Sequence, residues 1–258
     1  MTDYSRELET TIDAARKAGD ILMKHYGKVT VRYKSDGSLV TDADIESEKR
    51  IKELLGEKFP DYSMLGEESG RMDKASEYIW MIDPLDGTTN YSIQNPFFNV
   101  SIALARGDDP VLGVVYYPFQ DELFHAVKDE GAYLNNERIK VSERDIRDSV
   151  ICFCHAHDRE AVKTVHEIFS RIKQINCNLR QIGAAALELS YVACGRVGAF
   201  FTINLKPWDV AAGTVIVKEA GGRVTDFKGN PFTLKARDIL ASNGRMHDDL
   251  LELINPGE

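Results

Sequence analysis

The sequence predicts a mixed α and β fold, built as one compact unit from two packed halves. Its 258 residues are enough for a large core but too few for several independent domains. Residues 1–145 combine helical patterns with a run of strand-like segments, whereas residues 146–258 alternate helices with strands. We therefore expect an N-terminal α+β subdomain, 1–145, with an antiparallel sheet, joined without a flexible linker to a C-terminal α/β subdomain, 146–258.

Helices are predicted at the N-terminus. Apolar residues from Leu8 to Leu22 recur at helical spacing between charged residues, and Gly27 follows as a stop signal. Turn-forming and charged residues fill 34–44, and an apolar stripe then runs through 45–59. A polar loop should therefore lead into a second helix.

Strand-like segments fill the middle of the chain. A short apolar run over 78–83 ends in an acid, and further runs follow between Gly, Asp and Pro turns, at 97–105, 110–118 and 122–135. This part predicts the antiparallel sheet. Beyond residue 141 the pattern becomes helical over 158–172, 183–195 and 208–222, with a strand-like stretch at 198–204.

Bulk properties limit the possible functions. The formal net charge of −9 disfavours nonspecific affinity for nucleic acid, so cations are more natural partners. No run approaches the roughly 20 apolar residues that cross a bilayer, and the polar, acidic start does not resemble a signal peptide, so we expect a cytoplasmic protein without membrane contact. Paired CxxC motifs are absent from the sequence, which favours reduced thiols at Cys152, Cys154, Cys177 and Cys194.

The stretch IDPLDGTTN, residues 82–90, is the most informative. Pro84 disfavours helix at Asp83 and fixes a bend, so Asp83 and Asp86 can turn toward one point, while Gly87 lets backbone approach a ligand closely. Converging carboxylates suit Mg²⁺. A helix opening after Gly87 would add free N–H groups for an anion. The alternative is that the two aspartates only make a turn and a helix cap.

Further acidic residues occur in two other motifs. In GEES, Glu67 follows an apolar pair and should lie at the end of a strand; in KPWDVAAG, Asp209 stands at the start of a helix rich in small residues. Each has a plain alternative, because Glu67 and Glu68 could be solvated surface charges and Asp209 could be a helix cap.

Together, GEES, WMIDPLDGTTNY and KPWDVAAG…EAGG resemble the inositol monophosphatase family, a branch of the metal-dependent, lithium-sensitive phosphatase superfamily. The similarity runs from Val40 to the SNG stretch at Ser242. The resemblance implies a layered αβαβα sandwich, the sugar-phosphatase fold, and a homodimer. It also implies a hydrolase that uses two or three Mg²⁺ ions, with Mn²⁺ as a substitute and Li⁺ or Ca²⁺ as inhibitors.

The same resemblance assigns metal ligands. Glu67, Asp83 and the backbone carbonyl of Leu85 would bind a first Mg²⁺, and Asp83, Asp86 and Asp209 a second. Glu67 would also lie near a third, weakly held ion. Metals in such a pair neutralise the phosphate and stabilise the attacking and leaving oxygens.

Catalytic and substrate-binding roles follow from the resemblance too. Water would be the nucleophile, positioned by Thr88 with Asp44 behind it, and Glu67 belongs to the same catalytic set. Asp44 has a structural alternative, a capping pair with Thr41. The phosphate would meet the backbone N–H groups of Gly87 and Thr88.

The polyol ring would lie against Asp86, Asp209 and the backbone N–H groups of the GAAA segment at Gly183, Ala184 and Ala185. Lys34 falls where the family carries a basic residue on a loop near the site, although it could equally be a solvated surface charge.

The sequence departs from the family pattern at Thr202. Seven residues before the KPWD aspartate, animal inositol monophosphatases carry a glutamate that accepts hydrogen bonds from the ring. A threonine there weakens strict selectivity for inositol 1-phosphate and leaves room for other phosphorylated polyols, including fructose 1,6-bisphosphate.

Other functions stay open at this level. The alternatives are a 3′-phosphoadenosine or histidinol-phosphate phosphatase of the same superfamily, and a regulatory binding protein that retains the fold. The CFCHAH stretch, residues 152–157, gathers possible zinc ligands, but its alternation fits a buried strand better.

Overall fold

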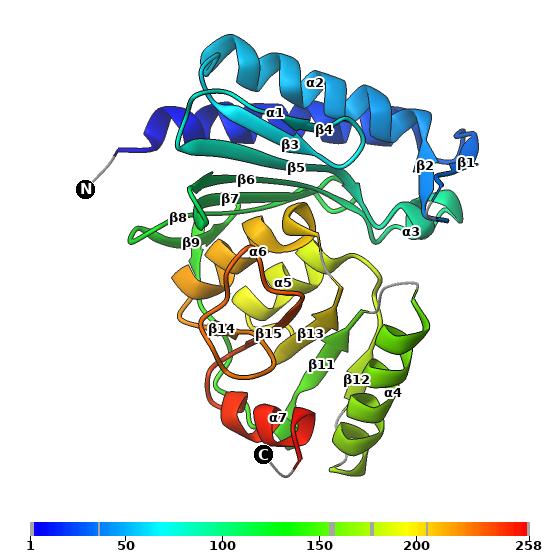
Figure 1. The fold of residues 1–258 in the computed structure, drawn as a ribbon, viewed down its shortest axis with the longest axis vertical. Coiled ribbons are helices and arrows are strands. Elements are labelled where there is room, and N and C mark those ends of the chain that lie inside the picture. The colour runs from blue at the N-terminus through cyan, green and yellow to red at the C-terminus, as the bar shows by residue number, and fades with distance from the viewer. Residues whose placement is uncertain (1–2, 36, 155–157, 176–177, 205, 257–258) are drawn as a thin grey trace.

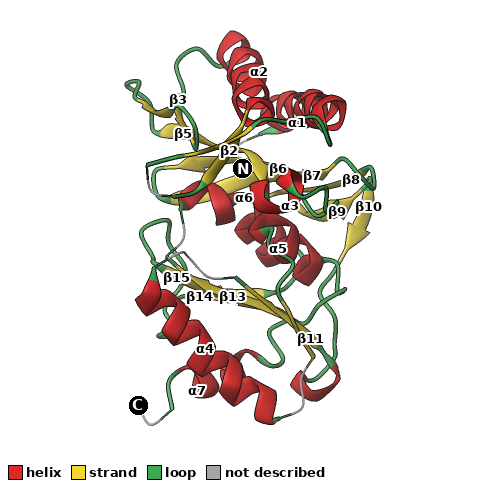
Figure 2. Ribbon diagram, turned by 90° about the vertical axis from the view of Figure 1, so that its right-hand side faces the viewer, coloured by secondary structure: helices red, strands yellow, loops and turns green. Residues whose placement is uncertain are grey.

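The structure is a computed structural model that describes residues 3–35, 37–154, 158–175, 178–204 and 206–256. Its helices and sheets stack in alternating layers, in the order helix, sheet, helix, sheet, helix (Figures 1 and 2). The αβαβα sandwich expected from the sequence is therefore confirmed. No helix within the described residues has the length and apolar character to span a membrane.

The first outer layer consists of α1 (Ser5–His25) and α2 (Asp42–Lys58), which lie side by side on the larger sheet (Figure 1). Small residues of α1, including Ala14, Ala15 and Ala18, are fully buried in the core they share with this sheet. Such small side chains let a helix approach the strands closely, because little volume separates the two backbones.

The larger sheet is antiparallel as predicted, except at one place. Its strands lie in the order β10-β9-β8-β7-β6-β5-β3-β4, with bounds β3 (Ser63–Gly66), β4 (Gly70–Met72), β5 (Tyr78–Asp86), β6 (Asn99–Arg106), β7 (Asp109–Tyr117), β8 (Glu122–Val127), β9 (Gly131–Leu134) and β10 (Glu137–Ile139). Strands β3 and β5 run parallel, with Gly66 beside Ile82. The residues that follow, Glu67 and Asp83, therefore come at the same end of the two strands.

The middle layer joins the two sheets. It consists of α5 (Ala185–Ala193) and α6 (Pro207–Glu219), whose apolar residues share one core with Ala103 of the larger sheet and Phe200 of the smaller one. The contact is close: a Cβ on Gly113 of β7 would lie 2.4 Å from the carbonyl oxygen of Ala212. The two sheets are thus held in one unit by a continuous core.

The smaller sheet comes entirely from the second half of the described chain. Its strand order is β12-β11-β13-β15-β14, with bounds β11 (Val150–Phe153), β12 (Asn178–Arg180), β13 (Ala199–Ile203), β14 (Arg223–Thr225) and β15 (Asp238–Ser242). The outer face carries α4 (Arg159–Gln174) and α7 (His247–Ile254), and a short 3₁₀ turn, η1 (Ile146–Asp148), precedes β11 (Figure 1). The chain changes sheets between Ile139 and Val150.

The prediction of a polar loop over 34–44 is partly wrong. Strands β1 (Val31–Tyr33) and β2 (Leu39–Thr41) pair antiparallel as a hairpin, and α2 begins at Asp42, three residues before the predicted start. The sequence does not predict β1, because all three of its residues are exposed and its side chains therefore do not alternate between core and solvent.

Candidate functional site

A cavity of about 530 Å³ lies where the edge of the larger sheet meets the middle helices. This volume suits a small ligand. Its described wall includes most of the residues singled out in the sequence, namely Glu67, Asp83, Leu85, Asp86, Gly87, Thr88, Gly183, Ala185, Thr202 and Asp209. The structure thus gathers residues that are up to 142 positions apart, from Glu67 to Asp209.

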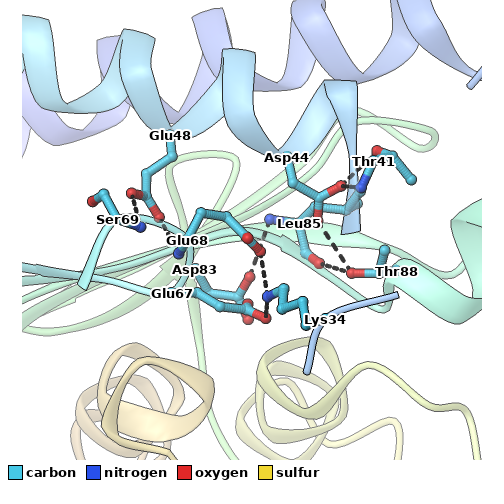
Figure 3. Close-up of polar contacts among 10 residues, drawn as sticks. All are labelled: Lys34, Thr41, Asp44, Glu48, Glu67, Glu68, Ser69, Asp83, Leu85 and Thr88. Carbon is cyan, nitrogen blue, oxygen red and sulfur yellow. Dashed lines mark hydrogen bonds and ion pairs between the residues drawn. The ribbon is translucent and has the colours of Figure 1, made fainter. Parts of the chain in front are cut away.

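Glu67 stands one residue beyond the end of β3, as predicted, and its N–H donates to the carbonyl of Ile82 at 3.1 Å. Lys34 reaches it from the β1–β2 turn: Nζ donates to Oε1 of Glu67 at 2.8 Å and to Oε1 of Glu68 at 2.5 Å (Figure 3). Burial lowers the pKa of Lys34, but these hydrogen bonds outweigh it and leave the pKa above its ordinary value. Lys34 is therefore no solvated surface charge.

The Asp83–Asp86 segment ends β5 with an irregularity in its pairing to β6. Oδ1 of Asp83 accepts the N–H of Leu85 at 3.0 Å, which closes the turn around Pro84. The side chain of Leu85 is buried, although the residue lines the cavity. Leu85 can therefore contribute polar groups to the cavity only through its backbone.

Asp86 is held by donors on both sides of the cavity. Oδ2 accepts Nδ2 of Asn99 at 2.7 Å and the N–H of Ala186 at 2.8 Å, while Oδ1 accepts the N–H of Ala185 at 3.1 Å. Burial raises the pKa of Asp86 to about 6, against the lowering effect of these hydrogen bonds. Asp86 thus ties the first turn of α5 to the larger sheet.

Gly87 and the short helix α3 (Thr88–Ser92) follow directly. Gly87 has φ +89°, and a Cβ there would lie 2.7 Å from the carbonyl oxygen of Phe97, so both conformation and space require glycine. The N–H groups in the first turn of a helix have no partner within the helix. The helix start predicted from the sequence is confirmed, and it lies on the cavity wall.

Asp44 makes contacts compatible with both roles weighed for it, the helix cap and the support of Thr88. As a cap, its Oδ2 accepts the N–H of Thr41 at 2.8 Å and the Thr41 hydroxyl at 2.5 Å; toward the site, its Oδ1 lies 3.3 Å from the hydroxyl of Thr88, which also lies 3.0 Å from the carbonyl of Leu85 (Figure 3). Asp44 lies behind Thr88, fully buried. Burial raises the pKa of Asp44 to about 6.

Asp209 approaches from the opposite side, in the first turn of α6. Its Oδ2 accepts the N–H of Lys206 at 2.9 Å, so it is also a helix cap. Burial raises the pKa of Asp209 to about 8, with help from the charges of Asp86 and Glu67. The capping alternative and a role in the site are therefore compatible.

The gathered carboxylates repel one another. Burial and then the charges of Glu67, Asp86 and Asp209 raise the pKa of Asp83 well above its ordinary value. Buried carboxylates of this kind need a cation or protons, so the donor set fits a hard divalent ion. Among the described Cys, His, Asp and Glu side chains, no group of three already surrounds a single metal position. An ion that binds Glu67 through Oε1 must displace the ammonium of Lys34.

The wall from the second half of the chain is largely neutral. It includes Cys154, Gln181, Gly183, Thr202 and Asn204. The expectation that Ala184 and Ala185 offer their N–H groups to a ligand needs correction, because Ala184 is fully buried and not part of the cavity wall, and the N–H of Ala185 is donated to Asp86.

The zinc alternative gains no support from the described residues of the CFCHAH stretch. Cys152 is buried in β11, and the thiol of Cys154 lies 2.9 Å from Oε2 of the buried Glu188. Burial raises the pKa of both thiols. His155, His157 and Cys177 lie outside the described residues.

Comparison with known proteins identifies the family. The model of the inositol monophosphatase family matches residues 3–256. The chain belongs to the inositol monophosphatase family. Its relatives include a protein of Aquifex aeolicus named fructose-1,6-bisphosphatase/inositol-1-monophosphatase, 38% identical over 98% of this chain and 97% of the relative.

Other members of the inositol monophosphatase family carry a different name. Nus factor SuhB of Pasteurella multocida is 38% identical over 96% of both chains. The crystal structure of extragenic suppressor protein suhB from Bartonella henselae superimposes with a TM-score of 0.94 at 36% identity, covering 98% of this chain and 100% of that one. Membership makes this chain a phosphoric monoester hydrolase by class.

Sequence reasoning missed the residues that hold this family's motifs in place. Nδ2 of Asn90 donates to the carbonyls of Phe97 and Ile182, each at 2.8 Å, and so joins the loop after α3 to the segment before α5. Asn99, which donates to Asp86, and Glu48, which accepts the N–H of Glu68, also join segments that are distant in sequence. Asparagine and glutamate in such places carry no local signal, because their partners are distant in sequence.

Proposed function

We propose that this chain is a Mg²⁺-dependent phosphomonoesterase that hydrolyses inositol 1-phosphate. The observation that carries the proposal is the set of carboxylates that line one cavity, from Glu67, Asp83 and Asp86 on one side and Asp209 on the other, beside the first turn of α3. Bound divalent cations supply charge neutralisation of the phosphate and stabilise the attacking and leaving oxygens. Glu67, Asp83, Asp86, Asp209 and the Leu85 carbonyl would hold these ions.

The chain's own groups position the reactants. The N–H groups of Gly87 and Thr88 would bind phosphate oxygens, since the first turn of a helix leaves them unpaired within the helix. Burial raises the pKa of Asp44 to about 6, which still leaves a carboxylate at neutral pH, and its Oδ1 can accept a hydrogen bond from the Thr88 hydroxyl at 3.3 Å. The Thr88 oxygen can then accept a hydrogen bond from water and turn the water oxygen toward phosphorus.

The alcohol part of the substrate would face the neutral wall. No lysine or arginine is among the described residues that line the cavity, whereas Gln181, Thr202 and Asn204 offer amides and a hydroxyl. Such groups suit the hydroxyls of a neutral polyol better than a second phosphate, which binds most strongly to cations. We therefore propose inositol 1-phosphate as the better substrate and fructose 1,6-bisphosphate as the poorer one.

Our expectations on the number of metal ions, inhibition, assembly and location belong to the same proposal. Binding of two or three Mg²⁺ ions, inhibition by Li⁺, a homodimer and a cytoplasmic location all rest on the family resemblance. The two-subdomain division at residue 145 is proposed on the change of sheet between β10 and β11.

A substrate panel tests the proposal. Phosphate release should be measured from inositol 1-phosphate, fructose 1,6-bisphosphate, 3′-phosphoadenosine 5′-phosphate and histidinol phosphate, each with Mg²⁺, with EDTA and with added Li⁺. The proposal expects the highest kcat/KM for inositol 1-phosphate and no turnover in EDTA. A clear preference for another ester would replace the substrate, and EDTA-resistant turnover would overturn the metal dependence.

A further inference from the structure

Glu48 of α2 holds the turn that carries Glu67. Its carboxylate is buried, with 2% of the residue exposed. Oε2 accepts the N–H of Glu68 at 2.8 Å, and Oε1 accepts the N–H of Ser69 at 2.9 Å (Figure 3). Both carboxylate oxygens are therefore used on the backbone of one turn. Hydrogen bonds to a charged acceptor are among the stronger ones in proteins, and leaving buried N–H groups without a partner is costly.

The same carboxylate packs against the other side of Glu67. A Cβ on Gly66 would lie 2.6 Å from the Glu48 carboxyl group, so glycine is needed for β3 to pass this close. One turn further along α2, Nζ of Lys52 donates to the hydroxyl of Ser69 at 2.6 Å. Helix α2 thus hydrogen-bonds the turn after Glu67 and packs closely against the strand end before it.

The inner face of α2 also reaches the Asp83 segment. Ser47, one residue before Glu48 and three after Asp44, donates to the carbonyl of Pro84 at 3.2 Å. Asp44, Ser47 and Glu48 lie at helical spacing and therefore share one face. A single rigid helix thereby contacts segments that carry Thr88, Asp83 and Glu67.

We propose that Glu48 is a positioning residue for Mg²⁺ binding, acting through the backbone around Glu67 rather than on the ion or the substrate. The inference rests on the proposed function. Groups that orient metal ligands typically contribute 10–100-fold to metal affinity or activity. Loss of the Glu48 carboxylate should therefore weaken Mg²⁺ binding by about 10–100-fold, and saturating Mg²⁺ should recover turnover that is lost at low Mg²⁺.

Calorimetric titration with Mg²⁺ tests this directly, without reference to any substrate. The variants are Glu48→Ala, which removes both acceptors, and Glu48→Gln, which keeps the volume and one acceptor oxygen. The control is Glu57→Gln, on the exposed face of the same helix. We expect the Mg²⁺ Kd to rise most in Glu48→Ala, less in Glu48→Gln and not in Glu57→Gln. The Mg²⁺ concentration for half-maximal phosphate release should follow the same order.

A merely structural role gives a different result. Folded Glu48→Gln or Glu48→Ala that melts at a lower temperature but binds Mg²⁺ as tightly as wild type would overturn the inference. If Glu48→Ala does not fold, the Glu48→Gln titration decides. If the wild-type protein binds Mg²⁺ but hydrolyses none of the esters, the proposed substrate is wrong and the Mg²⁺ titration of the Glu48 variants is still valid. If the wild-type protein binds no Mg²⁺, both the proposed function and the role of Glu48 are wrong.

Discussion

The two walls of the cavity differ in charge and in how firmly they are held. On the wall from the larger sheet, Asp86 accepts three hydrogen bonds, and Glu67 lies in a turn whose N–H groups donate to Glu48 of α2. The wall from the smaller sheet presents Thr202 and Gln181, which carry no charge. Asp209 is the acidic exception on that side. From this difference we expect phosphate chemistry to depend mainly on the first wall, together with Asp209, and the choice of alcohol on the neutral residues of the second.

The largest effect is expected from Asp83→Asn on the charged wall. Asp83 is the carboxylate proposed to bridge two ions, which together supply several kcal/mol of charge stabilisation. Since each 1.36 kcal/mol is tenfold in rate, kcat/KM should fall by about a thousandfold. Phosphate release at saturating Mg²⁺ measures it. A fall of less than tenfold would place the chemistry elsewhere.

Gly87→Ala should follow, with a loss of roughly 100-fold in kcat/KM, because the new Cβ would meet the Phe97 carbonyl oxygen at 2.7 Å and displace the start of α3. The matched control is Gly107→Ala. Gly107 has φ +62°, and a Cβ there would meet no atom within 4 Å, so that variant suffers strain without a clash. It should melt at a slightly lower temperature and keep its activity. Equal losses in both variants would argue against a role for the Gly87 site.

Stability in EDTA should fall as pH rises, because the carboxylates that line the cavity then lack their cation. The pKa of Asp86 is raised to about 6 and that of Asp209 to about 8, above the ordinary value of 3.8. The folded state therefore binds more protons than the unfolded state between pH 4 and pH 8, and the free energy of unfolding decreases across that window.

Melting temperatures at pH 6 and pH 8.5, with EDTA and with Mg²⁺, measure this effect. Mg²⁺ should raise the melting temperature more at pH 8.5 than at pH 6. Equal stability at both pH values in EDTA would contradict the raised pKa values of Asp86 and Asp209.

The smallest effect is expected on the neutral wall, from Thr202→Val. This change exchanges a hydroxyl for a methyl group at a buried position of β13. One neutral hydrogen bond contributes about 0.5–1.5 kcal/mol, so kcat/KM for inositol 1-phosphate should fall about 2–10-fold. The Mg²⁺ dependence should not change. A shifted Mg²⁺ affinity would mean that the two walls are not separate in function.

The charged wall was also the more predictable one. Asp83, Asp86 and Gly87 lie within five residues, so their spacing alone indicated a bend toward one point. The helix at Thr88 and the strand end before Glu67 followed from local signals and are confirmed. Local patterns succeed here because each signal and its consequence are adjacent in the chain.

Supporting contacts could not be predicted in the same way. Glu48 stands in a stretch of charges, ESEKR, where a glutamate looks like a solvated residue, and its partners are 20 and 21 positions away. Asn99 and Ala186 meet at Asp86 only because β6 and α5 pack around it. The parallel pairing of β3 with β5 likewise depends on the whole sheet.

The proposed metal site is tested by Mg²⁺ titration of wild type and Asp209→Asn, with calorimetry and phosphate release measured on the same samples. Asparagine keeps an oxygen to accept the Lys206 N–H, so α6 should stay capped. The account predicts that the folded variant binds Mg²⁺ more weakly and loses most turnover of inositol 1-phosphate. A folded variant with wild-type Mg²⁺ affinity and turnover would contradict the proposed metal site.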